Sequence, residues 1–105
     1  YGAGHGSEVA YAFNNLGARW GVTTTTPEDE KLGISMNTYW VNFVKTGNPN
    51  GRHLPNWPLY SIQKNEILEF ENNGIPASKK DPTKERLDVI EKAGNYRDKL
   101  QSRGI

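Results

Sequence analysis

The chain of 105 residues contains no cysteine, which excludes a disulfide framework and a thiolate metal site. It also has no apolar run near the roughly 20 residues that a helix needs to cross a bilayer, so no membrane span is expected. The chain also lacks an excess of charge of one sign, because 13 basic and 12 acidic residues leave a net charge of +1. A chain without a basic field has little to attract nucleic acid, and no nucleic-acid partner is expected.

Apolar residues are scarce as well. Only 34% of the residues are hydrophobic, whereas globular domains reach about 45–50% when glycine is included. Three Trp, five Tyr and three Phe still supply large side chains that a fold can bury. A core made by this chain alone would be thin, and the chain does not begin with Met. We therefore expect it to be the tail of a longer protein, docked on a larger body.

A long helix is predicted over residues 27–46. Thr26 suits the N-cap and Pro27 suits the first helical position, and three acidic residues after them favour the positive end of the helix dipole. Gly47 can end the helix in a left-handed conformation, and Pro49 prevents its continuation. The apolar positions recur at helical spacing and share one face: Leu32, Met36, Tyr39, Trp40 and Phe43.

The other elements are predicted to be short, except the last. Residues 1–8 form a glycine-rich loop, and residues 9–16 are expected to form a short helix or strand. Residues 17–26 form a polar connector in which Trp20 is the one anchor. Short strands are predicted further on, the last of them at an edge: residues 59–60, 67–70 and 75–77.

A terminal helix is predicted from a cap at Asp81, followed by Pro82, to about Leu100. Its apolar stripe is thin and interrupted: Leu87, Ile90 and Leu100, with Ala93 and Gly94 between. This pattern is typical of a helix on a protein surface.

The first histidine lies in a turn dominated by glycine. His5 stands between Gly4 and Gly6, and glycine lets the backbone bend sharply and keeps bulk away from the ring. Because imidazole titrates near neutral pH, His5 is a candidate general base that takes a proton from a hydroxyl nucleophile and returns it to a leaving group. The alternative is an ordinary loop histidine that bonds to solvent or backbone.

Glu8 follows His5 by three residues and has three interpretations. It caps the following segment, accepts a hydrogen bond from the loop backbone, or orients the imidazole. A structural role is favoured, because a carboxylate so close in sequence rarely reaches the neighbouring ring in triad geometry. A metal site is not expected, because His53 lies far along the chain and no HExxH spacing is present.

No serine is placed as a nucleophile. The strained elbow that presents such a serine reads G-x-S-x-G, whereas residues 5–9 around Ser7 read HGSEV. The chain also has no HGGG-type stretch for an oxyanion hole. It therefore carries a candidate base without the hydroxyl on which that base would act.

Three stretches, in this order, resemble type-B carboxylesterases, the family that includes cholinesterases and para-nitrobenzyl esterases. GHGSE at residues 4–8, with Tyr11 and Phe13 after it, is similar to the histidine loop of that family. The pattern MxxYWVNFxxTGxPN at residues 36–50 is similar to its C-terminal helix and the exit from that helix. WPxY at residues 57–60 is similar to the segment that follows.

The resemblance runs from about residue 2 to residue 90 and implies the α/β class. Residues 1–105 would be the C-terminal part of an α/β-hydrolase domain: a histidine loop, a long amphipathic helix, short edge strands and a terminal helix. In that family the triad histidine comes last in chain order. The resemblance implies that His5 is this catalytic histidine and that Glu8 is an acidic residue supporting its loop.

The implied activity is carboxylic ester hydrolysis by a serine esterase through an acyl-enzyme, without a cofactor. The partner would be the N-terminal remainder of the same esterase, which would hold the serine, the acid and the oxyanion hole, and the substrate a small-molecule ester. This chain alone is expected to be inactive. A non-catalytic esterase-like adhesion or binding protein and a small α+β binding module remain alternatives. The resemblance favours a secreted or periplasmic location.

Overall fold

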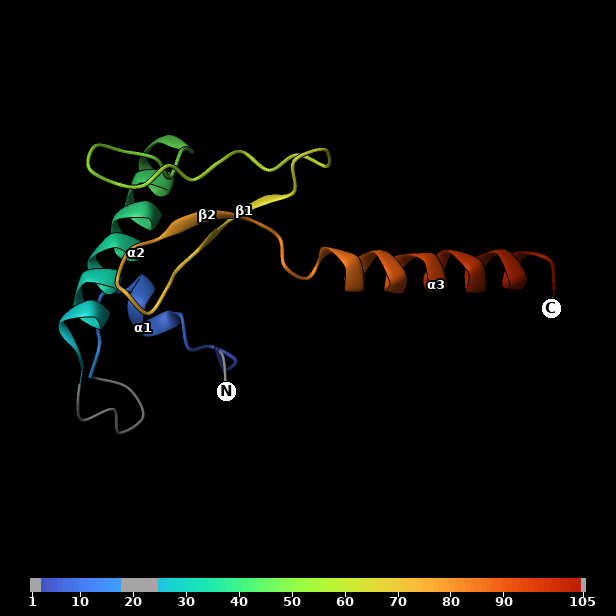
Figure 1. Cartoon of the computed structure of the whole chain (residues 1–105), viewed down its shortest axis with the longest axis horizontal. Coiled ribbons are helices and arrows are strands. Elements are labelled where there is room, and N and C mark those ends of the chain that lie inside the picture. Colours follow the sequence, from blue (N-terminus) through green and yellow to red (C-terminus); the bar gives the residue numbers. More distant parts are fainter. Residues whose placement is uncertain (1–2, 18–24, 105) are drawn as a thin grey trace.

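The structure, a computed structural model, describes residues 3–17 and 25–104. Most of the predicted connector at 17–26, including its anchor Trp20, lies outside these residues. The described chain forms, in order, α1 (Val9–Ala12), α2 (Pro27–Thr46), β1 (Glu66–Glu69), β2 (Ala77–Lys80) and α3 (Lys84–Ser102) (Figure 1). The segment after the histidine is thus helical, which decides between the two predictions made for it.

Helix α2 begins and ends where its sequence signals place it. The Thr26 hydroxyl accepts the N–H of Asp29 at 3.1 Å, and the Asp29 carboxylate accepts the N–H of Thr26 at 3.0 Å, which completes a capping box. At the other end, Gly47 adopts a φ of +76° and its N–H donates to the carbonyl of Phe43. The prediction of a helix over 27–46 is confirmed.

The two strands form an antiparallel hairpin. Glu66 pairs with Lys80 at one end of the ladder and Glu69 pairs with Ala77 at the other. The turn between them contains Gly74 at a φ of +79°, where an added Cβ would lie 3.0 Å from the carbonyl oxygen of Glu28. The hairpin therefore closes against the first turn of α2.

The predicted strand at 59–60 is wrong, since those residues lie in no strand. Leu59 is 93% exposed, with no neighbouring strand to pair it. The strand predicted at 67–70 is found one residue earlier, and that at 75–77 is shifted to 77–80. Pro76 explains the shift, because a proline has no N–H to donate to a ladder.

A small aromatic core joins α2 to the segments that follow it. Tyr39 is fully buried and its hydroxyl donates to the carbonyl of Pro55. Its ring meets Trp57 edge-to-face at 5.4 Å and Phe70 at 5.9 Å. Such aromatic pairs stabilise a fold by about 0.5–1.5 kcal/mol beyond the area that they bury.

Asn50 holds the loop that carries Trp57. Its Oδ1 accepts the N–H of Trp57 at 2.6 Å, and its Nδ2 donates to the carbonyl of Trp57 at 2.9 Å. One side chain thereby satisfies both backbone groups of a residue that lies in neither helix nor strand. Asn50 is the last residue of the pattern at 36–50 that resembles the family.

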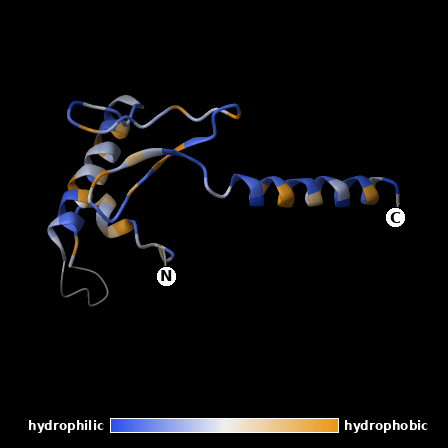
Figure 2. Cartoon of the chain, viewed as in Figure 1, coloured by the Kyte–Doolittle hydropathy of each residue, from blue (hydrophilic) through white to orange (hydrophobic). Residues whose placement is uncertain are grey.

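Helix α3 projects away from the other elements (Figure 1) and buries no residue. The radius of gyration is 18.2 Å, whereas a compact domain of this length has about 13 Å. Figure 2 shows hydrophobic residues recurring along α3 and no other described helix or strand beside it. Leu87 and Ile90 are 52% and 64% exposed. The prediction of a surface helix is confirmed.

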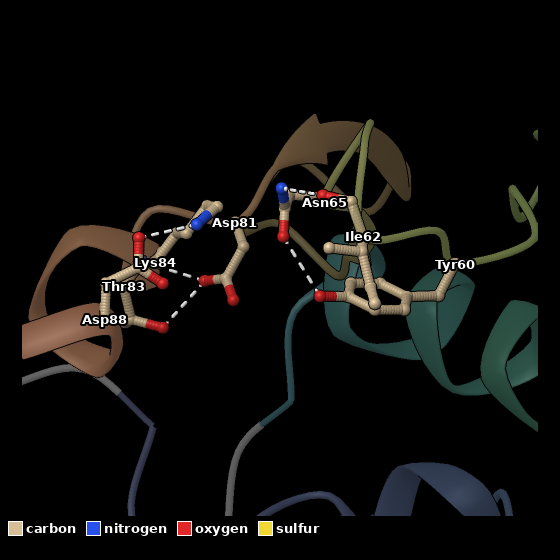
Figure 3. Close-up of polar contacts among 7 residues, drawn as sticks. All are labelled: Tyr60, Ile62, Asn65, Asp81, Thr83, Lys84 and Asp88. Carbon is tan, nitrogen blue, oxygen red and sulfur yellow. Dashed lines mark hydrogen bonds and ion pairs between the residues drawn. The ribbon is translucent and has the colours of Figure 1, made fainter. Parts of the chain in front are cut away.

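The start of α3 differs from the prediction. Asp81 is not its cap, because the Asp81 Oδ1 accepts both the N–H and the hydroxyl of Thr83 in a turn that precedes the helix (Figure 3). Thr83 occupies the cap position without a side-chain cap bond. The N–H of Asp81 donates to the carbonyl of Asn65, which ties this junction to the loop before β1. No helix among the described residues is long and apolar enough to cross a membrane.

Candidate functional site

The histidine lies in a tight turn on the surface of the molecule. The N–H of Ser7 donates to the carbonyl of Gly4 at 3.2 Å, and the N–H of Val9 donates to that of Gly6 at 3.3 Å. Gly6 has a φ of +73°, a conformation that favours glycine. An added Cβ at Gly4 would contact no described residue beyond its two chain neighbours. His5 is exposed.

The imidazole of His5 forms no hydrogen bond or ion pair with another residue in the parts of the chain described. Glu8 occupies the cap position of α1, but its side chain makes no cap bond, so the capping interpretation is wrong. Its backbone is already helical, with φ −73° and ψ −21°, whereas a side chain that caps needs an extended backbone. The carboxylate of Glu8 is exposed.

Two side-chain hydrogen bonds tie α1 to α2. The hydroxyl of Tyr11 donates to Asp29 Oδ1 at 3.0 Å, across 18 residues of sequence. Asn37 Nδ2 donates to the carbonyl of Ala12 at 2.8 Å. Ala12 itself is buried. The sequence analysis treated Asp29 as a helix-dipole residue and missed both bonds, because neither partner is near the other in the chain.

The Tyr11–Asp29 contact perturbs both ionisable groups. Burial, followed by the hydrogen bond to the Asp29 carboxylate, raises the pKa of Tyr11. The N–H of Thr26, followed by the phenol of Tyr11, holds the pKa of Asp29 below its usual value. A carboxylate that accepts several hydrogen bonds favours its charged form. Asp29 is therefore an anion at neutral pH, with both oxygens occupied.

The exit from α1 packs closely on α2 at a glycine. An added Cβ at Gly33 would lie 3.1 Å from Asn14 Oδ1 and 3.4 Å from Leu16 Cδ1. Gly33 is buried, and a glycine in mid-helix is a signal of such a close approach. That signal was present in the sequence and was not used. The His5 turn thus stands on a short helix held at three points.

A second feature is an open groove of about 1010 Å³ beside the C-terminal half of α2. Trp40, Phe43 and Val44 line one side of it, and Leu59 and Ile67 line the other. Phe43 and Val44 are 58% and 83% exposed. Trp40 and Phe43 belong to the apolar face predicted for the helix, and the described residues leave both partly uncovered.

The chemistry available in the described residues is limited. His5 is a candidate proton acceptor, and Ser7 beside it is exposed in a turn that lacks the elbow geometry of a nucleophile. Within 3–17 and 25–104, no three residues of the metal-ligating types gather into a group able to hold an ion. A complete ester-hydrolysing site is not assembled from these residues.

Comparison with known proteins identifies the family. The sequence profile described as "Carboxylesterase family" matches residues 1–90. Cocaine esterase of Homo sapiens is 39% identical over 69 residues, which are 65% of this chain and 12% of that protein. Liver carboxylesterase 1 of Oryctolagus cuniculus is 42% identical over 60 residues, which are 57% of this chain and 10% of that protein.

The fold is similar to that of a solved carboxylesterase from Geobacillus stearothermophilus. Its structure at pH 6.8 superimposes with a TM-score of 0.60 and 32% identity, over 72% of this chain and 17% of that chain. Its structure at pH 6.2 gives a TM-score of 0.65 over 79% of this chain and 18% of that chain. The predicted α/β class is confirmed, because this chain superimposes on part of the α/β-hydrolase fold of a carboxylesterase.

The chain spans only about a tenth of the length of the curated relatives that it matches. Residues 91–105, which form most of α3, lie beyond the family match. The family match decides against an unrelated α+β binding module. From its sequence profile, its relatives and its fold, the chain belongs to the carboxylesterase family.

Proposed function

We propose that this chain is the C-terminal part of an α/β-hydrolase domain and supplies the catalytic histidine of a serine carboxylesterase. The observation that carries the proposal is the exposed imidazole of His5 on a glycine turn, inside the segment that matches the family. A general base has to come within hydrogen-bond distance of the proton that it accepts, and an exposed ring with no hydrogen-bond partner among the described residues can do so.

The remaining parts of the site belong to the N-terminal remainder of the same esterase. That remainder supplies the serine, the acidic residue and the oxyanion hole. The groove beside α2 supports this arrangement, because Trp40, Phe43 and Val44 are large apolar side chains left in contact with solvent. Covering the exposed part of each side chain contributes a fraction of the roughly 1.5–3 kcal/mol that full burial of such a side chain provides. By itself the chain is inactive.

In the complete site, His5 accepts the proton of the serine hydroxyl as its oxygen attacks the ester carbonyl. It then donates that proton to the departing alcohol, which leaves an acyl-enzyme. A water molecule then gives a proton to the same imidazole as its oxygen attacks the acyl group, and the imidazole returns that proton to the serine oxygen as the acyl–serine bond breaks and the carboxylic acid leaves. Glu8, whose carboxylate is exposed three residues away, stands at the acidic position that supports this loop.

The test replaces the two histidines of this chain in the full-length protein, one at a time. His5→Asn removes the base, and we expect kcat for para-nitrophenyl acetate to fall by about 10⁴-fold or more. His53→Asn is the matched control. His53 is exposed in a loop at a φ of +66°, a conformation that asparagine also adopts.

Turnover by the His5→Asn variant within tenfold of the parent would contradict the proposal. A full-length protein that hydrolyses no aryl ester, whichever residue stands at position 5, would instead support the non-catalytic binding relative.

A further inference from the structure

We propose that Tyr11 and Asp29 form a positioning pair that sets where the imidazole of His5 lies. The inference rests on the proposed function and extends it to residues outside the His5 turn. Neither residue touches the reacting atoms. Their role is to fix the short helix from which the turn projects.

The first step concerns what holds the ring. No hydrogen bond joins the imidazole to another described residue, so within this part of the protein the backbone around His5 places the ring. That backbone runs through two turn bonds, from Ser7 to Gly4 and from Val9 to Gly6, directly into α1. Helix α1 has only four residues, and so short a helix is not stable by itself. Its contacts with α2 must therefore place the turn.

The second step concerns which contact lies nearest to the histidine. The Tyr11–Asp29 bond is made in the first half of the segment that follows the turn, at 3.0 Å. The Asn37–Ala12 bond and the close approach at Gly33 come later in the chain. Tyr11 is thus the first residue after His5 whose side chain makes a hydrogen bond to another helix.

The third step concerns the rigidity of the anchor. Asp29 Oδ2 accepts the N–H of Thr26 in the capping box of α2, while Asp29 Oδ1 accepts the phenol of Tyr11. The carboxylate is therefore held by its own helix before it binds α1. A hydrogen bond to a charged acceptor is about twice as strong as a neutral one. The Asp29 carboxylate thus joins the start of α2 to α1, the helix that follows the histidine turn.

The experiment measures kcat and KM separately in the full-length protein with para-nitrophenyl acetate. Tyr11→Phe removes only the hydroxyl. We expect kcat to fall on the order of tenfold, because a misplacement of 1 Å can cost a hundredfold, while KM stays within twofold of the parent. A loss confined to kcat indicates an interaction needed in the transition state.

Two control variants separate positioning from general loosening. Thr26→Ala removes the hydroxyl that accepts the Asp29 N–H but keeps the Thr26 N–H on Asp29 Oδ2 and the Tyr11–Asp29 bond, and its kcat should fall less than that of Tyr11→Phe. Tyr96→Phe makes the same chemical change as Tyr11→Phe on α3, where Tyr96 is 66% exposed, and it should change neither constant. An equal loss of kcat in Tyr11→Phe and Thr26→Ala would overturn the proposal, as would a normal kcat in Tyr11→Phe.

If Tyr11→Phe fails to fold, Asp29→Asn tests the same contact. Its amide keeps one accepting oxygen for the two donors, so its kcat should lie below that of the parent, and a parental kcat would overturn the pair. The His5→Asn variant keeps the two proposals apart. Normal turnover by His5→Asn sinks the proposed function, whereas an inactive His5→Asn with a normal Tyr11→Phe sinks the positioning pair alone.

Discussion

Helices α2 and α3 have nearly the same length, 20 and 19 residues, but α2 is packed against other segments and α3 is exposed. Helix α2 has a capping box at its start, a left-handed glycine at its end and four buried residues: Leu32, Gly33, Met36 and Tyr39. Helix α3 has no side-chain cap and buries nothing. The helical spacing of apolar residues therefore predicts that a helix forms, but it does not predict whether that helix packs against the rest of the chain.

The two helices also differ in what holds them. Helix α2 contacts α1, the aromatic core and the turn of the hairpin through named side chains. Helix α3 relies on its own backbone and on pairs such as Lys84–Asp88, at 2.6 Å. An exposed pair of this kind contributes little to the stability of a helix. The family match covers all of α2 and ends at residue 90, within the second turn of α3.

The largest difference in stability between the two helices is expected when a tyrosine of each is replaced by alanine. Tyr39→Ala in α2 empties the centre of the aromatic core and leaves the Pro55 carbonyl without its donor, so we expect a loss of about 3–5 kcal/mol in the free energy of unfolding. Tyr96→Ala in α3 should change it by less than about 0.5 kcal/mol. Urea unfolding measures both. Equal losses would show that α3 is packed in the complete protein and would end the comparison.

Replacing a glycine by leucine should change the stability in opposite directions in the two helices. Gly33→Leu in α2 forces a side chain against Asn14 and Leu16, and overpacking of this kind costs about 1–3 kcal/mol. Gly94→Leu in α3 meets open space and should stabilise the helix by up to about 1 kcal/mol. Thermal unfolding followed by circular dichroism measures both. A destabilising Gly94→Leu would indicate a partner packed on α3.

The smallest effect concerns the caps. Thr26→Ala removes the hydroxyl that accepts the Asp29 N–H, and we expect a loss of about 1 kcal/mol. Thr83→Ala removes a hydroxyl that bonds to Asp81 and caps no helix N–H, so its effect should be smaller. Helix content and urea midpoints measure the difference. A larger loss in Thr83→Ala would mean that the turn before α3 matters more than the capping box of α2.

The sequence predicted α2 well because every signal for it is local. A cap, a proline, acidic residues, helical spacing and a terminal glycine all lie within the same short stretch. The predicted start of α3 was wrong by two residues. Asp81 and Thr83 are both residue types that cap helices, and the bonds from Thr83 to Asp81 that form the preceding turn are seen only in the structure. The strand at 59–60 failed because pairing needs a partner, and alternation in one segment does not provide it.

In the candidate site, too, the features that depend on adjacent residues were predicted and those that join distant segments were not. His5 and its glycine turn were recognisable from a few adjacent residues, and the family motif around them is equally local. The bond from Tyr11 to Asp29 was not, because it joins two elements across 18 residues. Asn50 likewise belonged to a recognised motif, while its bonds to Trp57 became visible only when the loop was folded.

The amino-acid sequence by itself determined the length of α2, the position of the histidine turn and the resemblance to carboxylesterases, because each depends on neighbours along the chain. Only the tertiary structure decided the register of the hairpin, the anchoring of α1 by Tyr11 and the exposure of α3. Those features depend on which surfaces meet in space. Burial and hydrogen bonding between distant segments, rather than local backbone preference, select them.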